Sequence, residues 1–134
     1  MNNKYKILLV EDDENIRIMV GAMLESAGYQ VIETRSCNTA ITLAVSHIPD
    51  LILLDVMLPG TDGMTLLRQC AEASIRPAIL VTTRLYSEFI VNTLAKLGVS
   101  YILPKPCQIA AVTTSVRELS NLPPPSPAPA QPTV

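Results

Sequence analysis

Short apolar runs alternate along this chain with longer stretches in which apolar residues recur every three or four positions. A short apolar run bounded by turn-forming residues is typical of a buried strand. These runs predict five strands, at Tyr5–Val10, Gln30–Glu33, Leu51–Leu54, Ala78–Val81 and Tyr101–Leu103. The helical spacing predicts a helix after each strand, from the N-cap Asp13 to Gly28, then at Asn38–His47, Met64–Ala73, Ser87–Leu97 and Gln108–Leu119.

The first and last helices have the clearest amphipathic pattern, and the residues of each apolar face are expected to point into the core. In the first helix these are Ile16, Met19, Val20, Met23, Leu24 and Ala27. In the last helix they are Ile109, Val112, Val116 and Leu119. Between the third strand and third helix, Pro59–Gly63 predicts a loop.

The third strand, Leu51–Leu54, is apolar at every position. Such a strand is typical of the centre of a parallel sheet that has helices on both faces. Five strand–helix units predict an α/β fold, a doubly wound parallel sheet of the flavodoxin-like type. The expected strand order is 2-1-3-4-5, in which the first and third strands meet where the order reverses.

Polar residues follow four of the predicted strands within two positions. They are the acidic run Glu11-Asp12-Asp13, then Asp55, Thr82 and Lys105. Because ligands of open parallel sheets bind outside the carboxyl ends of the strands, at the reversal of strand order, we expect these side chains to meet there. A solvated helix N-terminus would explain the acidic run alone, but not all four positions together.

Clustered carboxylates require a cation. Two like charges about 5 Å apart repel by roughly 3 kcal/mol at an effective dielectric of 20. Oxygen ligands with open positions suit Mg²⁺, which often bridges to a phosphate. Lys105 supplies a positive charge for a phosphoryl oxygen and Thr82 a hydroxyl donor, while Asp55 is placed to attack phosphorus.

Composition narrows the possible functions further. The length of 134 residues suits one domain, and a net charge of −2 gives no electrostatic footprint for nucleic acid. The sequence has neither an apolar run of membrane-spanning length nor a signal-peptide pattern. Three widely spaced cysteines, Cys37, Cys70 and Cys107, favour a reducing cytoplasmic compartment and are expected to be small buried apolar residues.

The last thirteen residues, 122–134, contain six prolines. Proline at this density favours extended polyproline II, which would span on the order of 40 Å. We therefore expect a domain at residues 1–121, followed by a proline-rich linker or tail at 122–134. A linker would indicate that the chain was cut from a longer protein, and a solvated end is the alternative.

The motifs around these positions resemble the receiver domain of two-component response regulators. The resemblance covers about residues 4–121 and rests on Leu8–Asp13, Asp50–Gly63, Pro77–Thr83 and Lys105-Pro106. Within it, Leu97–Pro106 is similar to the receivers of sporulation regulators of the stage-zero type. The resemblance implies a cytoplasmic signalling protein for transcription regulation. The resemblance implies no enzyme activity beyond self-phosphorylation from small phosphodonors and autodephosphorylation.

The resemblance also implies a role for each site residue. Asp55 accepts a phosphoryl group from a histidine kinase or phosphotransfer protein. Mg²⁺ (or Mn²⁺) is held by Asp12, Asp55 and the main-chain carbonyl of Met57, with Glu11 acting through water. Thr82 and Lys105 bind the phosphoryl oxygens, and the Lys105–Pro106 peptide bond is cis. DNA is expected to be contacted by a further C-terminal domain, not by this one.

Several positions depart from the family pattern, including Pro104, which removes a backbone donor from the last strand. Ile102 stands where the switch aromatic is usual, and Tyr101 lies one place earlier. Thr83 is larger than the residue that usually lies beside the phosphate, and Cys107 replaces an aromatic. Tyr86, Tyr101 and Ile102 are expected on a regulated surface of the fourth helix, fifth strand and fifth helix, which supports a phosphorylation-favoured homodimer.

Two alternatives use the same residues differently. A phosphatase of the haloacid-dehalogenase type would use Asp55 as nucleophile, but it needs an acid two places later, where this chain has Met57. A flavodoxin-like FMN carrier would place a phosphate beside the acidic loop, which repels it without a metal. His47, the sole histidine, is expected to be a surface or packing residue.

Overall fold

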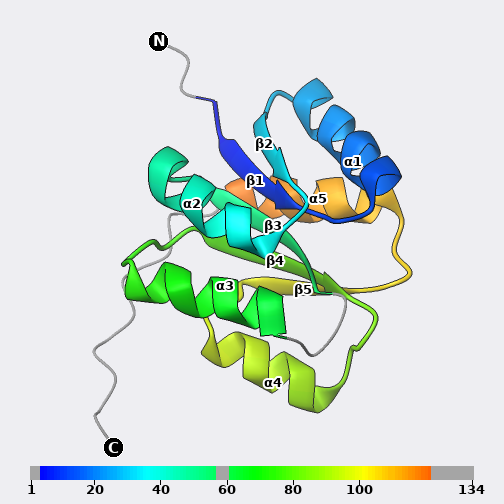
Figure 1. Cartoon of the computed structure of the whole chain (residues 1–134). Helices are drawn as coiled ribbons and strands as arrows, with labels where there is room; N and C mark the ends of the chain where they lie inside the picture. The colour runs from blue at the N-terminus through cyan, green and yellow to red at the C-terminus, as the bar shows by residue number, and fades with distance from the viewer. Residues whose placement is uncertain (1–3, 57–60, 122–134) are drawn as a thin grey trace, which may run out of the picture.

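The computed structural model describes residues 4–56 and 61–121, in which five strands alternate with five helices (Figure 1). The strands are β1 (Lys6–Val10), β2 (Gln30–Thr34), β3 (Leu51–Val56), β4 (Ala78–Thr83) and β5 (Tyr101–Pro104). The helices are α1 (Glu14–Ser26), α2 (Cys37–His47), α3 (Thr61–Glu72), α4 (Glu88–Lys96) and α5 (Ile109–Ser120).

All neighbouring strands pair in parallel, in the order β2-β1-β3-β4-β5. The predicted fold class and strand order are therefore confirmed. Strands β1 and β3 lie side by side at the centre, and the chain crosses from one half of the sheet to the other between them. Their carboxyl ends, with that of β4, form the edge at which ligands of doubly wound sheets bind.

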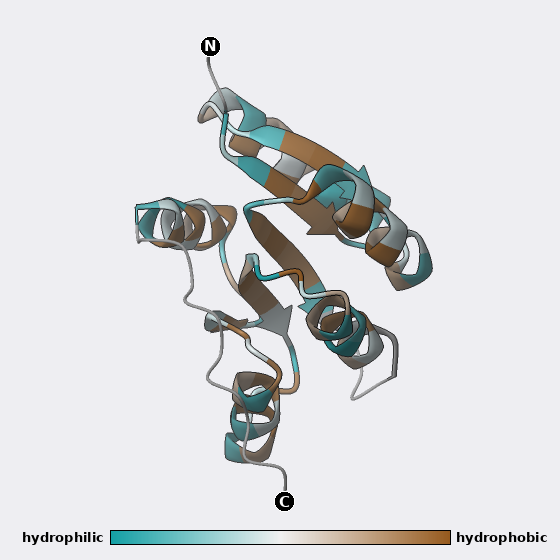
Figure 2. Cartoon of the chain, turned by 90° about the vertical axis from the view of Figure 1, so that its left-hand side faces the viewer, coloured by the Kyte–Doolittle hydropathy of each residue, from teal (hydrophilic) through white to brown (hydrophobic). Residues whose placement is uncertain are grey.

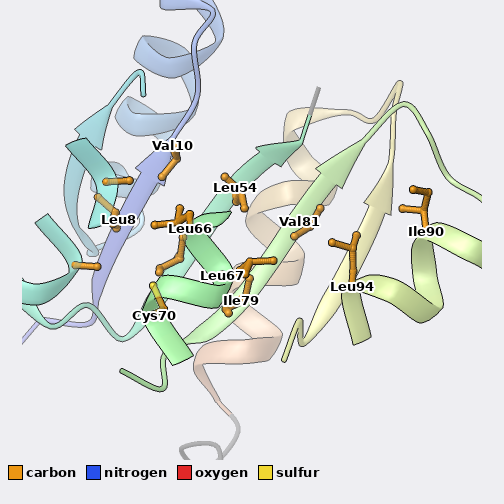
Figure 3. Packing of buried hydrophobic residues seen from close by; sticks show 13 residues of the cluster. Leu8, Val10, Leu54, Leu66, Leu67, Cys70, Ile79, Val81, Ile90 and Leu94 are labelled. Carbon is orange, nitrogen blue, oxygen red and sulfur yellow. The ribbon is translucent and has the colours of Figure 1, made fainter. Parts of the chain in front are cut away.

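Helices cover both faces of the sheet. Helices α1 and α5 pack on one face, and α2, α3 and α4 on the other (Figure 1). Each face has its own apolar cluster, so the strands are hydrophobic on both sides (Figure 2). On the α2–α3–α4 face, one cluster contains Leu8, Leu54 and Ile79 from the strands and Leu66, Leu67 and Leu94 from the helices (Figure 3).

Two strands extend further than their apolar runs. β3 continues through Asp55 to Val56 and β4 through Thr82 to Thr83, with Asp55 paired opposite Thr82. These polar residues thus lie within the strands, not after them as predicted. Ladder hydrogen bonds depend on the backbone, so pairing continues past the point where the side chains become polar.

The third helix begins at Thr61, three residues earlier than predicted, so the expectation that Thr61–Gly63 belongs to a loop was wrong. Threonine and aspartate are common at helix starts as well as in turns, which makes the two readings hard to separate from sequence. Helices α2, α4 and α5 differ from the prediction by one residue at their ends.

Helix α1 buries a narrower face than its sequence suggests. Asp13 is its N-cap, as predicted, and accepts a hydrogen bond from the Ile16 backbone amide at 3.0 Å. Val20 and Leu24 are buried, but Met19 and Met23 are 47% and 42% exposed and Ala27 is also exposed, which corrects the expectation that these three face the core. A helix lying on a sheet buries only the side chains that face the strands.

The remaining apolar positions show both agreement and correction. In α5, Val112 and Val116 are buried, and Ile109 and Leu119 pack against the same cluster, as predicted. Of the cysteines, Cys70 is buried, whereas Cys37 and Cys107 are only partly buried, contrary to expectation. None of the described helices is long and apolar enough to cross a membrane.

Candidate functional site

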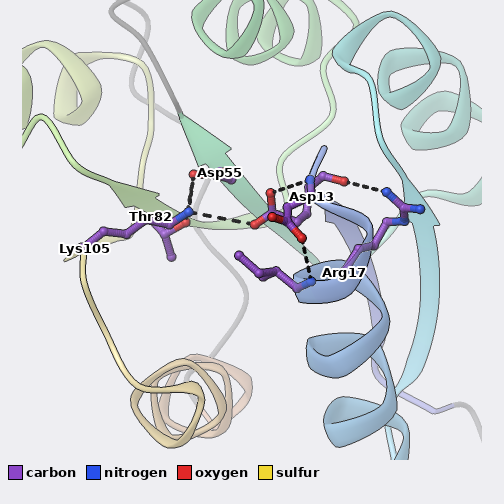
Figure 4. Close-up of polar contacts among 7 residues, drawn as sticks. Asp13, Arg17, Asp55, Thr82 and Lys105 are labelled. Carbon is purple, nitrogen blue, oxygen red and sulfur yellow. Dashed lines mark hydrogen bonds and ion pairs between the residues drawn. The ribbon is translucent and has the colours of Figure 1, made fainter.

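The carboxyl ends of β1, β3 and β4 and the segment after β5 bring the predicted residues together. Val10 of β1 pairs with Leu54 of β3, so Glu11 and Asp55 each come directly after a paired residue on neighbouring strands. Asp55 in turn pairs with Thr82 of β4. Lys105 reaches the same point from beyond the edge strand (Figure 4). The alternation of side chains places Glu11, Asp55 and Thr82 on the face that α1 and α5 cover.

Asp55 is at the centre of the site, and its side chain is only 5% exposed. Its Oδ1 lies 2.9 Å from Lys105 Nζ and accepts a weak hydrogen bond from the Thr82 hydroxyl at 3.5 Å. Its Oδ2 is buried and has no hydrogen-bond partner among the described residues. Leaving a buried carboxylate oxygen without a donor or cation is costly, so this atom marks a place for a ligand.

Glu11 is a second buried acid beside Asp55. Its Oε1 lies 3.9 Å from Lys105 Nζ, and its Oε2 accepts the Asp13 backbone amide at 3.2 Å. Burial, as the largest cause, and the neighbouring Asp55 carboxylate together raise the pKa of Glu11 from 4.5 to about 7, although the Asp13 amide and Lys105 oppose the shift. Close to neutral pH, the site therefore holds its negative charge at an energetic cost.

Three carboxylates at this edge fit a divalent cation. Glu11, Asp12 and Asp55 each offer an oxygen, and the three oxygens lie within 4.8 Å of one another. Asp12 is exposed, which leaves one side of the cluster open to solvent. Mg²⁺ prefers oxygen ligands and keeps several waters, so this donor set and the unpartnered Asp55 Oδ2 suit it. Met57, whose carbonyl was predicted as a ligand, lies outside the described residues.

An arginine that the sequence reasoning missed holds the backbone of the acidic run. Arg17 Nη1 donates a hydrogen bond to the Glu11 carbonyl at 3.0 Å, and its Nε lies 4.0 Å from Glu33 Oε1. The Glu11 amide in turn donates to the Thr34 carbonyl at 3.1 Å. Gly21 leaves room for the Glu33 carboxylate, since a Cβ there would lie 3.1 Å from its carboxyl carbon and would require that side chain to shift. The only feature of the sequence that could have indicated this contact is the spacing from Glu11 to Arg17.

Thr83 does not join the site residues through its side chain. Neighbouring residues of β4 face opposite sides, and Val81 belongs to the cluster on the α2–α3–α4 face. Thr83 is fully buried on that side, where its hydroxyl accepts the Leu85 amide at 3.0 Å. The expected effect of its bulk beside the phosphate stays a prediction. Strand alternation separates two residues that are adjacent in sequence.

The remaining predicted positions are distributed around the edge strand. The Lys105–Pro106 peptide bond is cis, the isomer that the family resemblance implies. Ile102 packs against the cluster that α4 contributes to, whereas Tyr86 and Tyr101 are 55% and 50% exposed. Exposed His47 lies at the end of α2 and contacts Lys6 through its carbonyl, so it is a surface residue.

A doubly wound sheet with carboxylates, a hydroxyl and a lysine at its switch point defines a class of protein that handles a phosphoryl group beside a divalent cation. The sequence profile described as the response regulator receiver domain matches residues 7–117. The chain belongs to this family, which consists of signalling domains of two-component systems. The matches do not favour the phosphatase alternative.

Individual proteins support the same assignment. The transcriptional regulatory protein ResD of Bacillus subtilis is 39% identical over 82 residues, which cover 61% of this chain and 34% of ResD. Sporulation initiation phosphotransferase F of B. subtilis is 26% identical, covering 84% and 91%. The non-phosphorylated HemR receiver domain of Leptospira biflexa superposes with a TM-score of 0.83 at 26% identity, covering 92% of this chain and 99% of that domain.

The lengths of these relatives bear on what can be transferred from them. The matched part of the chain spans 34–48% of the length of three transcriptional regulators, ResD and PhoP of Bacillus subtilis and PhoB of Pseudomonas aeruginosa. The sporulation phosphotransferase is matched over most of its length but at lower identity than ResD. The narrower likeness to sporulation regulators is therefore not distinguished from general membership of the receiver family.

Proposed function

We propose that Asp55 is the phosphoacceptor of this receiver domain. The observation that carries this assignment is the asymmetry of its carboxylate, whose Oδ1 contacts Lys105 while the buried Oδ2 has no partner among the described residues. A carboxylate oxygen forms the bond to phosphorus as the bond from phosphorus to the donor's nitrogen or oxygen breaks. Lys105 and Thr82 are placed to bind the oxygens of the transferred group.

Mg²⁺ or Mn²⁺ would be held by Asp12, Asp55 and the carbonyl of Met57, with Glu11 acting through water. Its chemical contribution is to neutralise negative charge on the phosphoryl oxygens as the donor leaves. Arg17 fixes the acidic run from behind by holding the Glu11 carbonyl. The phosphorylated form then reacts with water, so self-phosphorylation from small donors and autodephosphorylation are the only reactions we assign.

The partner that supplies the phosphoryl group is a histidine kinase or phosphotransfer protein, and the compartment is the cytoplasm. The output is transcription regulation, supported by relatives named as transcriptional regulatory proteins that are longer than this chain. DNA is contacted by an output domain, with residues 1–121 as the receiver and 122–134 as the linker. A homodimer through α4, β5 and α5 transmits the signal.

The assignment is tested by incubating the protein with Mg²⁺ and acetyl phosphate and measuring its mass. One added phosphoryl group is expected, labile to acid and lost on hydroxylamine treatment, as for an acyl phosphate. Asp55→Asn should abolish it, whereas Asp50→Asn, in an exposed acid at the other end of β3, should not. Stoichiometric labelling of the Asp55→Asn variant would refute the assignment.

A further inference from the structure

A pocket of about 510 Å³ extends from the site between α1 and α5. Its wall is mostly apolar and includes Leu9, Ile16, Val20, Leu53, Ile109 and Val112. Glu11, Asp55, Thr82, Lys105 and Arg84 form its polar part. The volume falls within the usual range for pockets that bind small molecules.

Phosphoryl transfer uses only the polar end of this pocket. A metal ion and a phosphoryl group are fully polar, and neither gains anything from contact with Leu53, Val20 or Val112. Apolar cavities of this kind bind hydrocarbon groups, because the walls lack partners for water. The receiver chemistry therefore leaves the apolar part of the pocket unexplained.

The polar end favours a donor with positive charge. Asp55 Oδ2, the buried atom without a partner among the described residues, can only accept a hydrogen bond when ionised. Glu11 and Asp12 place oxygens within 4.8 Å of the Asp55 carboxylate. Of the two facing cations, Lys105 is already engaged by Asp55 Oδ1 at 2.9 Å, and Arg84 is exposed to solvent.

We propose that this pocket binds a small amphipathic amine, with one aromatic ring or short hydrocarbon chain and one protonated nitrogen. The hydrocarbon part occupies the space between α1 and α5, against Leu9, Leu53 and Val112. The ammonium lies beside the carboxylates of Asp55 and Glu11, which line the pocket, and close to Asp12. A charge-assisted hydrogen bond at a buried carboxylate is stronger than one to a neutral donor, which sets the preference for an amine.

Such a ligand competes with Mg²⁺, because both neutralise the same carboxylates. This competition depends on the pocket's geometry alone and does not require phosphorylation. A second consequence rests on the proposed function: an amine in the pocket slows phosphorylation of Asp55 by excluding the metal. Amines of this class thereby regulate phosphorylation of the receiver independently of its kinase.

The test uses 2-phenylethylamine as the probe, titrated into the whole chain without metal while backbone amide resonances are recorded. Saturable shifts are expected in residues around Leu9, Leu53 and Val112. Two probes of similar shape serve as controls, the alcohol 2-phenylethanol and the acid 3-phenylpropionate. Both should bind at least roughly tenfold more weakly, since they lack the positive charge. Equal binding of the alcohol would overturn the cationic assignment.

Two variants separate the ends of the pocket. Asp55→Asn keeps the shape of the side chain but removes its charge, and it should weaken amine binding at least tenfold. Cys107→Phe should fill the apolar space and also weaken binding, whereas Thr114→Phe, on the exposed side of α5, should not. Val112→Phe provides a second pocket-filling variant if Cys107→Phe does not fold. Unchanged binding in both filling variants would refute the proposed location.

Competition with the metal completes the test. The apparent affinity for 2-phenylethylamine should fall as Mg²⁺ rises, and unchanged affinity at saturating Mg²⁺ would overturn the proposal. Labelling by acetyl phosphate is measured separately on the same protein without amine. Normal labelling with no amine binding would refute only the pocket proposal, whereas amine binding without labelling of Asp55 would refute only the proposed function.

Discussion

The ammonium of Lys105 lies 2.9 Å from Oδ1 of Asp55, and the two side chains are 14% and 5% exposed. One residue comes from a central strand and the other from the segment after the edge strand, so the tertiary fold alone creates this pair. Lys105 makes a second, longer contact with a carboxylate, to Oε1 of Glu11 at 3.9 Å. A single cation therefore compensates two buried acids, and its removal has consequences that can be measured.

Lys105→Met should destabilise the metal-free protein by on the order of 2–3 kcal/mol, because it leaves two buried carboxylates without their cation. Millimolar Mg²⁺ should restore part of this loss by binding the same acids. Urea unfolding in chelator and in Mg²⁺ measures both effects. Lys96→Met, an exposed lysine at the end of α4, should change stability by less than about 0.5 kcal/mol.

The pKa of Glu11, raised from 4.5 to about 7, makes stability depend on pH in the absence of metal. Between these values the folded protein holds a proton that the unfolded chain has released. The contribution of Glu11 is therefore most favourable at low pH and is lost as pH rises to about 7, by at most ~3 kcal/mol. Unfolding in chelator from pH 5 to 8 measures this slope.

The control for this pH dependence is Glu11→Gln, which removes the titrating group while keeping its size. The variant should be more stable than the wild type at pH 8 and should lose most of the slope between pH 5 and 7. A slope of the same size in the variant would show that another group is responsible.

Arg17→Met should weaken Mg²⁺ binding by roughly tenfold, because groups that orient metal ligands typically contribute this much to affinity. The loss follows from freeing the Glu11 carbonyl, which Arg17 holds at 3.0 Å. Mg²⁺ titration followed by amide resonances gives the dissociation constant. Arg68→Met, on the exposed side of α3, is the matched control. If Arg17→Met lowers stability but leaves Mg²⁺ affinity intact, its role is structural only.

Ile48→Gly should stabilise the protein by about 1 kcal/mol. Ile48 ends α2 with φ 49° and ψ 67°, a left-handed conformation that is unfavourable for a β-branched residue, and its side chain is 64% exposed. Thermal unfolding measures the gain. The same change at the exposed helical residue Val45 should instead lower stability by roughly 0.5 kcal/mol. A loss of stability in both variants would contradict the strain at Ile48.

We predict that the surface of α4 and β5 forms a dimer interface when the protein is phosphorylated. Phe89, Tyr86 and Tyr101 are 75%, 55% and 50% exposed there. Sedimentation velocity should show a larger mass with beryllofluoride, which mimics the phosphoryl group, and Phe89→Lys should prevent the increase. Ile18→Lys, at a residue of α1 that is 57% exposed, should not. An unchanged mass with beryllofluoride bound would exclude this dimer.

Much of this protein could be predicted from local patterns. Apolar runs and helical spacing predicted five strand–helix units in a parallel sheet, because strands buried on both faces are typical of such sheets. The strand order was expected from the flavodoxin-like fold type. The motif around Asp55, Thr82 and Lys105 indicated the site, since residues after parallel strands must meet at one edge. Asp13 was recognisable as a helix cap because capping depends only on the cap residue and the helix that follows it.

Other features required the tertiary structure. The burial of Thr83 on the face covered by α2, α3 and α4 depends on which side of β4 each residue faces, and this differs between adjacent residues. The exposure of Met19 and Met23 depends on how much of α1 the sheet covers. The contact of Arg17 with the Glu11 carbonyl, the raised pKa of Glu11 and the pocket between α1 and α5 all arise from distances between separate elements. A sequence pattern carries no information on such distances, because they are set by how the helices pack on the finished sheet.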